Sequence, residues 1–218
     1  MTQREIHSAI KILRREVPNW QTPIVTLMAE TYASPFRVLI SCVLSLRTQD
    51  ATTAKASRRL FAVADGPREM LRLTAQRIEK LIFPVGFYKT KAKNILEICR
   101  TLMDVHGGEV PDEIDELLKL KGVGRKTANL VVTLGYNKPG ICVDTHVHRI
   151  SNRWGYVRTK TPEKTESALR VKLPKQYWIE YNDLLVSFGQ HLCRPISPMC
   201  SRCPVSRYCD QLNVDLRR

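Results

Sequence analysis

The chain has 218 residues, of which 43% are hydrophobic, and this is enough to build a core in one large domain or two smaller ones. Its formal net charge of +14 and its pI of about 9.7 favour a polyanionic partner, with nucleic acid as the first candidate and an anionic membrane surface as the second. A solvated basic surface without a specific partner is the third interpretation. No stretch approaches the roughly 20 consecutive apolar residues of a membrane span, and no secretory signal is visible, so we expect a cytoplasmic protein.

The hydrophobic residues recur with a helical period along nearly the whole chain, which predicts an all-α fold with short loops. Capping signals agree with this pattern, because Thr74 is a favourable N-cap, Gly107-Gly108 ends a long helix and Pro111 suits the first turn of the next one. The predicted helices cover residues 3–16, 36–46, 50–64, 74–83, 88–106, 111–120, 124–136, 144–154, 162–172 and 176–191.

The glycine pair Gly122 and Gly124 interrupts the helical pattern between residues 117 and 128 and predicts two helices joined by a tight turn. Val123 can fill the space between these helices. The second helix would then direct its first amides and its positive dipole end outward, which suits a phosphate, and Arg125 adds charge at the same place. An ordinary helical hairpin with a glycine cap is the alternative interpretation.

Lys126 and Asp144 are the candidates for catalysis. The amine of Lys126, at the start of the second hairpin helix, can attack the sugar C1′ of a damaged nucleoside once it has lost its proton. Asp144, which precedes a helix, can stabilise the positive charge that develops on the sugar or assist proton transfer. A solvated lysine and a simple N-cap aspartate are the alternative roles.

The seven cysteines form two groups. Cys42, Cys99 and Cys142 are isolated in apolar surroundings and are expected to be buried. The other four lie within 17 residues with the spacing Cys-x6-Cys-x2-Cys-x5-Cys, and this clustering indicates a metal site, either tetrahedral zinc or an iron–sulfur cubane. They are Cys193, Cys200, Cys203 and Cys209. Arginines including Arg194 make the loop electropositive and suited to docking on DNA.

Two motifs together resemble the endonuclease III family. Gly-Val-Gly-Arg-Lys-Thr-Ala-Asn at residues 122–129 and Val-Asp-Thr-His-Val-His-Arg at 143–149 are similar to that family in sequence and in separation. The first looks like the helix–hairpin–helix of the DNA glycosylase superfamily. The resemblance implies that Lys126 is the Schiff-base nucleophile and Asp144 the catalytic carboxylate. It also implies that the four clustered cysteines hold a [4Fe–4S] cluster.

Two further loops resemble the family's loops that open the DNA duplex. Residues 85–92 are similar to its Gly-Leu-Tyr-x-x-Lys-Ala loop, with Phe87 in place of the leucine wedge. Residues 44–50 are similar to its Leu-Ser-x-Gln-x-x-Asp loop, with Arg47 where glutamine would fill the space of the everted nucleotide. The resemblance therefore implies DNA contacts by Phe87 and Arg47, whereas a core phenylalanine and a surface arginine are the alternatives.

The resemblance extends over residues 5–210 and implies two helical domains that flank a DNA-binding cleft. A six-helix domain with the hairpin would span residues 28–138, and a cluster domain would combine residues 1–27 with 139–218. It further implies a bifunctional DNA glycosylase and AP lyase of base excision repair, which removes oxidised pyrimidines and cleaves the strand by β-elimination. We expect a monomer that acts at the nucleoid on double-stranded DNA containing damaged bases or abasic sites.

Two alternative functions lead to different expectations. A mismatch glycosylase of the same superfamily is disfavoured by Lys126, because such relatives usually carry Ser or Tyr there, and by the nine residues that follow Cys209. A non-catalytic DNA-binding protein with structural zinc would be colourless, whereas a protein that holds an iron–sulfur cluster would be brown.

Overall fold

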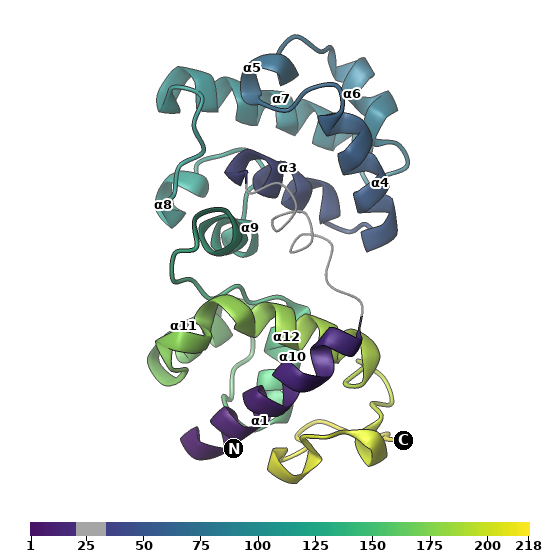
Figure 1. Cartoon of the computed structure of the whole chain (residues 1–218), viewed down its shortest axis with the longest axis vertical. Helices are drawn as coiled ribbons and strands as arrows, with labels where there is room; N and C mark the ends of the chain where they lie inside the picture. Colours follow the sequence, from purple (N-terminus) through teal and green to yellow (C-terminus); the bar gives the residue numbers. More distant parts are fainter. Residues whose placement is uncertain (21–33) are drawn as a thin grey trace. The chain divides into compact units, whose positions relative to one another are not determined.

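The computed structural model describes residues 1–20 and 34–218, and every regular element in these ranges is a helix (Figure 1). The prediction of an all-α fold is therefore confirmed for the described residues. The chain separates into a terminal unit, Met1–Pro23 with Ile141–Arg218, and a central unit, Ile24–Gly140. The boundary expected between residues 27 and 28 lies outside the described residues. No helix among those described is long and apolar enough to span a membrane.

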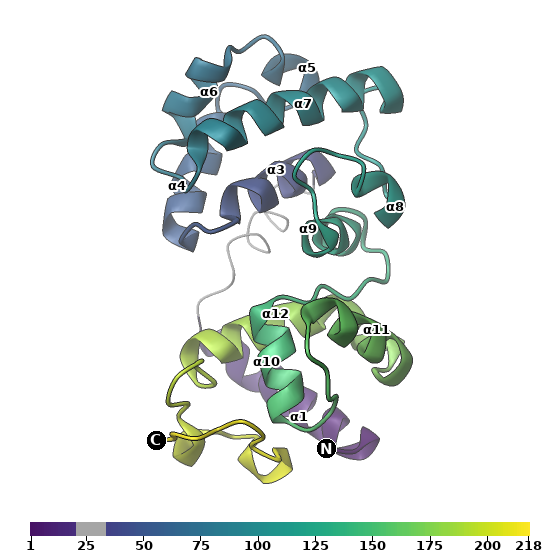
Figure 2. The same cartoon turned by 180° about the vertical axis from the view of Figure 1, so that it is seen from behind.

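The terminal unit is formed by segments from both ends of the sequence. Its main helices are α1 (Gln3–Glu16), α10 (Thr145–Arg153), α11 (Pro162–Lys172) and α12 (Trp178–His191), which Figure 2 shows from behind. A capping box begins α1, because the Thr2 amide donates to Glu5 Oε2 at 2.6 Å and the Glu5 amide donates to Thr2 Oγ1 at 3.3 Å. The apolar face of α1 is fully buried against Trp154, Tyr181 and Phe188. Residues more than 100 positions apart thus share one core.

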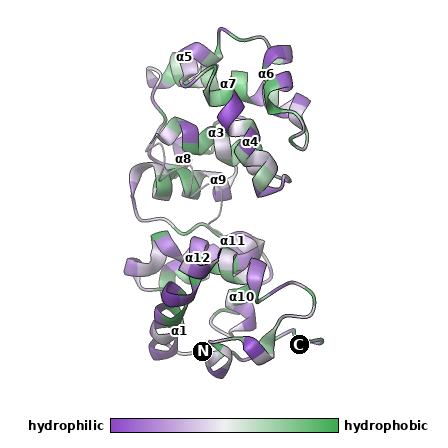
Figure 3. Ribbon diagram, turned by 45° about the vertical axis from the view of Figure 1, so that its right-hand side comes forward, coloured by the Kyte–Doolittle hydropathy of each residue, from purple (hydrophilic) through white to green (hydrophobic). Residues whose placement is uncertain are grey.

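The central unit surrounds helix α3, whose residues 36 and 38–44 are all buried. Its helices are α3 (Pro35–Ser45), α4 (Asp50–Phe61), α5 (Pro67–Met70), α6 (Ala75–Ile82), α7 (Tyr88–His106), α8 (Ile114–Leu117) and α9 (Arg125–Leu130). Helix α9 continues into a π-helical segment, Val131–Gly135. Figure 3 shows hydrophilic and hydrophobic residues alternating along the helices of both units, as expected for helices that each cover one side of a core.

The helices predicted from the sequence agree closely with those observed, with one clear exception. Residues 3–16, 88–106 and 162–172 have the predicted limits, and the Thr74 side chain caps α6 by accepting from the Arg77 amide at 3.2 Å. The helix predicted for residues 111–120 is wrong in extent, because α8 covers only Ile114–Leu117. The backbone at Glu113 is extended, with φ of −110° and ψ of 137°, and the carboxylates of Asp112 and Glu113 bind Lys138 at 2.8 and 3.0 Å.

Candidate active site and cluster loop

The turn of the hairpin joins α8 to α9 and exposes its backbone. Val123 is buried, and its amide donates to the Leu120 carbonyl at 3.1 Å. Gly122 has φ of +75°, a conformation that a side chain would strain. Gly124 is the N-cap of α9, and a Cβ atom placed on it would meet no other atom within 4 Å. The first amides of a helix are not used by its own hydrogen-bonding pattern, so this open corner suits an anionic group.

Lys126 is the second residue of α9 and is exposed, as is Arg125 beside it. Burial raises the pKa of the Cys42 thiol in α3 to about 12, and the positive charge of Lys126 opposes this with a smaller effect. The ammonium of Lys126 is therefore close enough to Cys42 of α3 to influence its pKa. A lysine at this position is both accessible to a substrate and held near a rigid, buried helix.

Asp144 forms the N-cap of α10 in the terminal unit and is buried. Its Oδ1 atom accepts hydrogen bonds from the amides of His146 and Val147, at 2.8 and 2.9 Å. Asp144 therefore has the N-cap role that was the structural alternative to catalysis. The same two bonds fix the orientation of the carboxylate, which is a requirement for a group that acts on a substrate.

Arg47 and Phe87 lie against each other in the central unit, where they line one groove. The Arg47 guanidinium carbon is 5.6 Å from the centre of the Phe87 ring, and 62% of Phe87 is exposed. The groove extends to Asn94 and to Gly122 of the hairpin turn. The interpretation of Phe87 as a core residue is wrong, because its ring faces the surface. Three of the residues expected to contact DNA therefore line the same concave surface.

Lys91 also lines this groove and corresponds to the lysine of the Gly-Leu-Tyr-x-x-Lys-Ala loop that residues 85–92 resemble, although no role was predicted for it. It is 5% exposed, and its Nζ atom donates to the carbonyls of Leu44 and Leu46 and to Thr48 Oγ1, at 2.8, 2.5 and 3.3 Å. These carbonyls lie at the C-terminal end of α3, where the helix dipole makes a cation favourable. Burial lowers the pKa of Lys91 to about 8.

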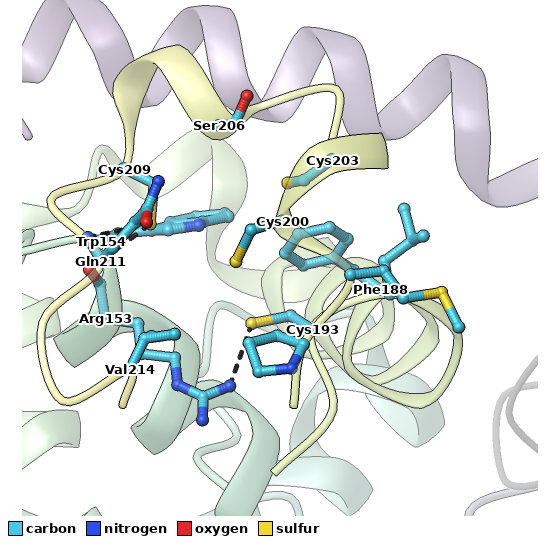
Figure 4. Close-up of a pocket in the computed structure, with 13 residues that line it drawn as sticks. Arg153, Trp154, Phe188, Cys193, Cys200, Cys203, Ser206, Cys209, Gln211 and Val214 are labelled. Atoms are coloured by element: carbon cyan, nitrogen blue, oxygen red, sulfur yellow. Dashed lines mark hydrogen bonds between the residues drawn. The ribbon is translucent and has the colours of Figure 1, made fainter. Parts of the chain in front are cut away.

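The four clustered cysteines of the terminal unit line one cavity, together with Trp154 and Phe188. Figure 4 shows Cys193 and Cys200 directing their sulfur atoms into the same space. Burial raises the pKa of Cys203 to about 12 and that of Cys209 to about 11, so thiolates at these positions require a compensating cation.

Arg153 holds this cysteine loop to α10 and was also missed in the sequence. Its side chain is buried, and it donates to the carbonyls of Arg194 and Pro195 at 2.7 and 2.6 Å and lies 3.5 Å from Cys193 Sγ. Its own carbonyl accepts from the Leu212 amide at 3.1 Å. The Arg194 side chain itself is exposed.

Four thiols around one cavity are a donor set that suits either a tetrahedral metal ion or an iron–sulfur cluster. Four thiolates around one zinc at about 2.3 Å would lie within about 4 Å of one another. Among the described residues, however, no three His, Cys, Asp or Glu side chains are grouped closely enough to bind one ion. In a cubane each thiolate binds a different iron, so the sulfur atoms are further apart.

The residues singled out from the sequence fall into both units. Arg47, Phe87, the hairpin residues and Lys126 belong to the central unit, whereas Asp144, Arg194 and the four cysteines belong to the terminal unit. Lys91 in the central unit and Arg153 in the terminal unit each donate hydrogen bonds to backbone carbonyls at least 41 residues away in sequence. Such long-range partners leave no local signal in the sequence.

Comparison with known proteins identifies the family. The family model of the HhH-GPD superfamily of base excision DNA repair proteins matches residues 40–175. Endonuclease III of Thermotoga maritima is 51% identical over 176 residues, which cover 81% of this chain and 83% of that protein. Endonuclease III of Escherichia coli K12 is 35% identical over 201 residues, which cover 92% and 94%. The structure of a trapped covalent intermediate of endonuclease III with DNA, an estranged-adenine complex, superposes with a TM-score of 0.86, 35% identity and 97% coverage of both chains.

These similarities extend over both units and include the hairpin, the residues around Asp144 and the cysteine loop. Because the family model covers more than half of the chain and close relatives match over most of their length, the assignment does not rest on a single motif. The chain belongs to the endonuclease III family of the HhH-GPD superfamily, the DNA glycosylases with AP lyase activity that act in base excision repair.

Proposed function

We propose that this enzyme removes oxidised pyrimidines from double-stranded DNA and cleaves the strand through a Schiff base on Lys126. The observation that carries the assignment of the nucleophile is the position of Lys126, an exposed amine in the first turn of α9 directly after the open hairpin turn. Supporting it, an endonuclease III with 35% sequence identity has been trapped as a covalent intermediate with DNA. The proposed substrates are double-stranded DNA with a damaged pyrimidine or an abasic site.

The hairpin turn is the proposed anchor for a DNA phosphate. The open space beside Gly124 allows a phosphate to approach the backbone, and the exposed Arg125 supplies positive charge there. Such contacts fix the position of the duplex without reading its sequence. Arg194 on the cysteine loop would contribute a further phosphate contact, and Phe87 with Arg47 would occupy the gap left by the everted nucleotide.

The reaction then follows from the chemistry of an amine and a sugar. The Lys126 amine, once deprotonated, forms a bond to C1′, and the glycosidic bond breaks with its electron pair leaving on the damaged base. Opening of the sugar gives a Schiff base between Lys126 and C1′. The Schiff base makes the C2′ proton acidic, and its removal expels the 3′-phosphate oxygen by β-elimination. Water finally releases Lys126.

Asp144 is proposed to act on the same nucleotide as Lys126. Its buried carboxylate, oriented by the two amides of α10, would stabilise positive charge on the sugar or assist proton transfer. The N-cap and the catalytic role are compatible, because both amide hydrogen bonds of the cap are accepted by the same oxygen, Oδ1. The two units are proposed to correspond to the hairpin domain and the cluster domain expected from the sequence.

Cys193, Cys200, Cys203 and Cys209 are proposed to bind a [4Fe–4S] cluster. When bound, the cluster supplies the cations that allow four neighbouring thiolates to coexist. Arg153 would hold the loop around it through the Arg194 and Pro195 carbonyls, and so keep the Arg194 side chain facing outward. This assigns the cluster a structural and DNA-docking role. We further propose that the protein acts as a monomer in the cytoplasm, at the nucleoid.

Borohydride trapping tests the nucleophile. With DNA that contains an abasic site or thymine glycol, the wild-type protein should give a covalent complex, and Lys126→Ala should give none because no amine can form the Schiff base. Lys119→Ala, which removes an exposed lysine paired with Glu116, is the matched control and should be trapped like the wild type. Undiminished trapping of Lys126→Ala would assign the nucleophile to another residue.

Two substitutions at Asp144 separate its structural role from its chemical role. Asparagine also caps helices well, so Asp144→Asn should keep the wild-type thermal stability and DNA affinity but slow base removal by about 100-fold or more. Asp144→Ala should in addition lose about 0.5–2 kcal/mol of unfolding free energy. Thermal unfolding and single-turnover excision measure both quantities. Equal rates for Asp144→Asn and the wild type would reduce Asp144 to a cap.

The two hairpin glycines should respond differently to alanine. Gly124→Ala should fold normally, because its Cβ meets nothing, but should bind DNA about tenfold more weakly because the methyl group occupies the approach of the phosphate. Gly122→Ala should instead lose about 1–2 kcal/mol of stability, because φ is +75° and its Cβ would lie 2.8 Å from Asn94 Nδ2. DNA binding by fluorescence anisotropy and thermal melting distinguish them. Unchanged affinity of Gly124→Ala would contradict the proposed anchor.

Metal analysis tests the cluster. The purified protein should be brown and contain about four iron and four sulfide per chain. Cys209→Ser should lose the colour and become sensitive to proteolysis between residues 193 and 209, whereas the buried Cys99→Ser should keep the colour. One zinc per chain in colourless protein, produced with ample iron, would refute the assignment.

A further inference from the structure

Residues 210–218, the strap, fold back across the cysteine loop although they form no helix or strand. Gln211 and Asn213 have φ values of +52° and +56°, in the left-handed region that residues other than glycine seldom adopt. Such conformations persist only where the surrounding structure imposes them. The two residues turn the backbone after Cys209, so that the strap runs back toward the first part of the loop instead of leaving it.

The start of the strap is bound to a cysteine and to helix α10. The Gln211 amide donates to Cys209 Sγ at 3.4 Å, and the Leu212 amide donates to the Arg153 carbonyl at 3.1 Å. Arg153 also binds the loop through its side chain, so one residue of α10 holds both the loop and the strap. Hydrogen bonds to cysteine sulfur are one means by which a protein tunes an iron–sulfur cluster, and the strap supplies one.

The far end of the strap is bound to the residues around Cys200. The Arg218 amide donates to the Pro198 carbonyl at 2.9 Å, and the Ser201 amide donates to the Arg218 carbonyl at 2.8 Å. Burial raises the pKa of the Cys200 thiol, and the positive charge of Arg217 opposes this rise. The strap therefore reaches from the last of the four cysteines back to the second.

Two side chains of the strap, Gln211 and Val214, line the cavity of the four cysteines. Figure 4 shows both at the edge of the space between these cysteines. The Arg217 guanidinium donates to Gln211 Oε1 at 2.6 Å, and this bond joins the two ends of the strap. Trp154 and Phe188 are each only 1% exposed, so the core closes the cavity where they line it, and access from solvent lies beside the loop and the strap.

We propose, on the basis of the cluster proposed above, that the strap gates access from solvent to the cluster and that the bond between Arg217 and Gln211 keeps this gate closed. Arg217 is exposed and the strap is held by a few polar contacts, so the strap can open while the core of the terminal unit stays folded. The closed strap excludes small molecules that remove or oxidise iron. The lifetime of the cluster then depends on how often the strap opens.

The release of iron from the cluster-loaded protein measures this access. Bipyridine is an uncharged iron chelator, so its approach does not depend on the charge of Arg217, and with dithionite present to keep the iron ferrous its coloured complex reports the rate. Release is proportional to the open fraction of the strap when the strap closes faster than the chelator acts. Arg217→Ala and Gln211→Ala each remove the bond and should accelerate release about fivefold. The double variant should be no faster than the faster single variant, because both changes break the same bond.

Arg158→Ala is the matched control, since it removes an exposed arginine of the same unit outside the cysteine loop and should release iron at the wild-type rate. Both strap variants should melt at the wild-type temperature, because Arg217 lies on the surface and outside the core.

Release from both variants at the wild-type rate, effects that multiply in the double variant, or faster release matched by a lower melting temperature would each overturn the gate. Failure of the cluster assignment has a different signature, namely wild-type protein that contains no iron and sulfide. Cluster-loaded variants that release iron no faster than the wild type would refute only the strap.

Discussion

The geometry of the hairpin turn is the constraint from which the proposed chemistry of the central unit follows. Gly122 can adopt positive φ, Val123 can then reach the interior, and α9 can begin immediately at Arg125. One short turn thereby fixes three properties together: an open approach to the backbone at Gly124, a basic side chain at that opening, and an amine in the first turn of the next helix. A longer or more flexible connection would supply the same residues without placing the anchor and the nucleophile next to each other.

Two buried cations, Lys91 and Arg153, stabilise the two units by binding backbone carbonyls rather than acidic side chains. Lys91 donates hydrogen bonds to carbonyls at the end of α3, and Arg153 donates hydrogen bonds to carbonyls of the cysteine loop. Carbonyl groups carry no net charge, so these hydrogen bonds do not neutralise either side chain. The net charge of +14 is thus partly built into the framework and not only distributed over the surface.

The sequence predicted most of the fold where local signals decide the outcome. Helices α7 and α11 have strong periodicity and clear ends, and their limits were predicted to the residue. The start of α8 was not, because the backbone at Glu113 is extended where the sequence pattern predicted a helix. For the site, the motifs identified Lys126, Asp144 and the four cysteines as candidates. The supporting roles of Lys91, which matches the lysine of a recognised loop, and of Arg153 were not predicted, since such a role is recognisable only once the carbonyls that the side chain binds have been located.

The mixed origin of the terminal unit has a consequence for biosynthesis. Helix α1 is synthesised before the central unit, yet Ile6, Ile10 and Leu13 share their buried cluster, among the described residues, with many side chains from residues 141–205. Domains generally fold during synthesis from the N-terminus, so the residues of the central unit emerge in full while α1 still lacks its partners. The apolar side chains of residues 3–16 therefore stay without their partners in the nascent chain until the residues after 140 have been made.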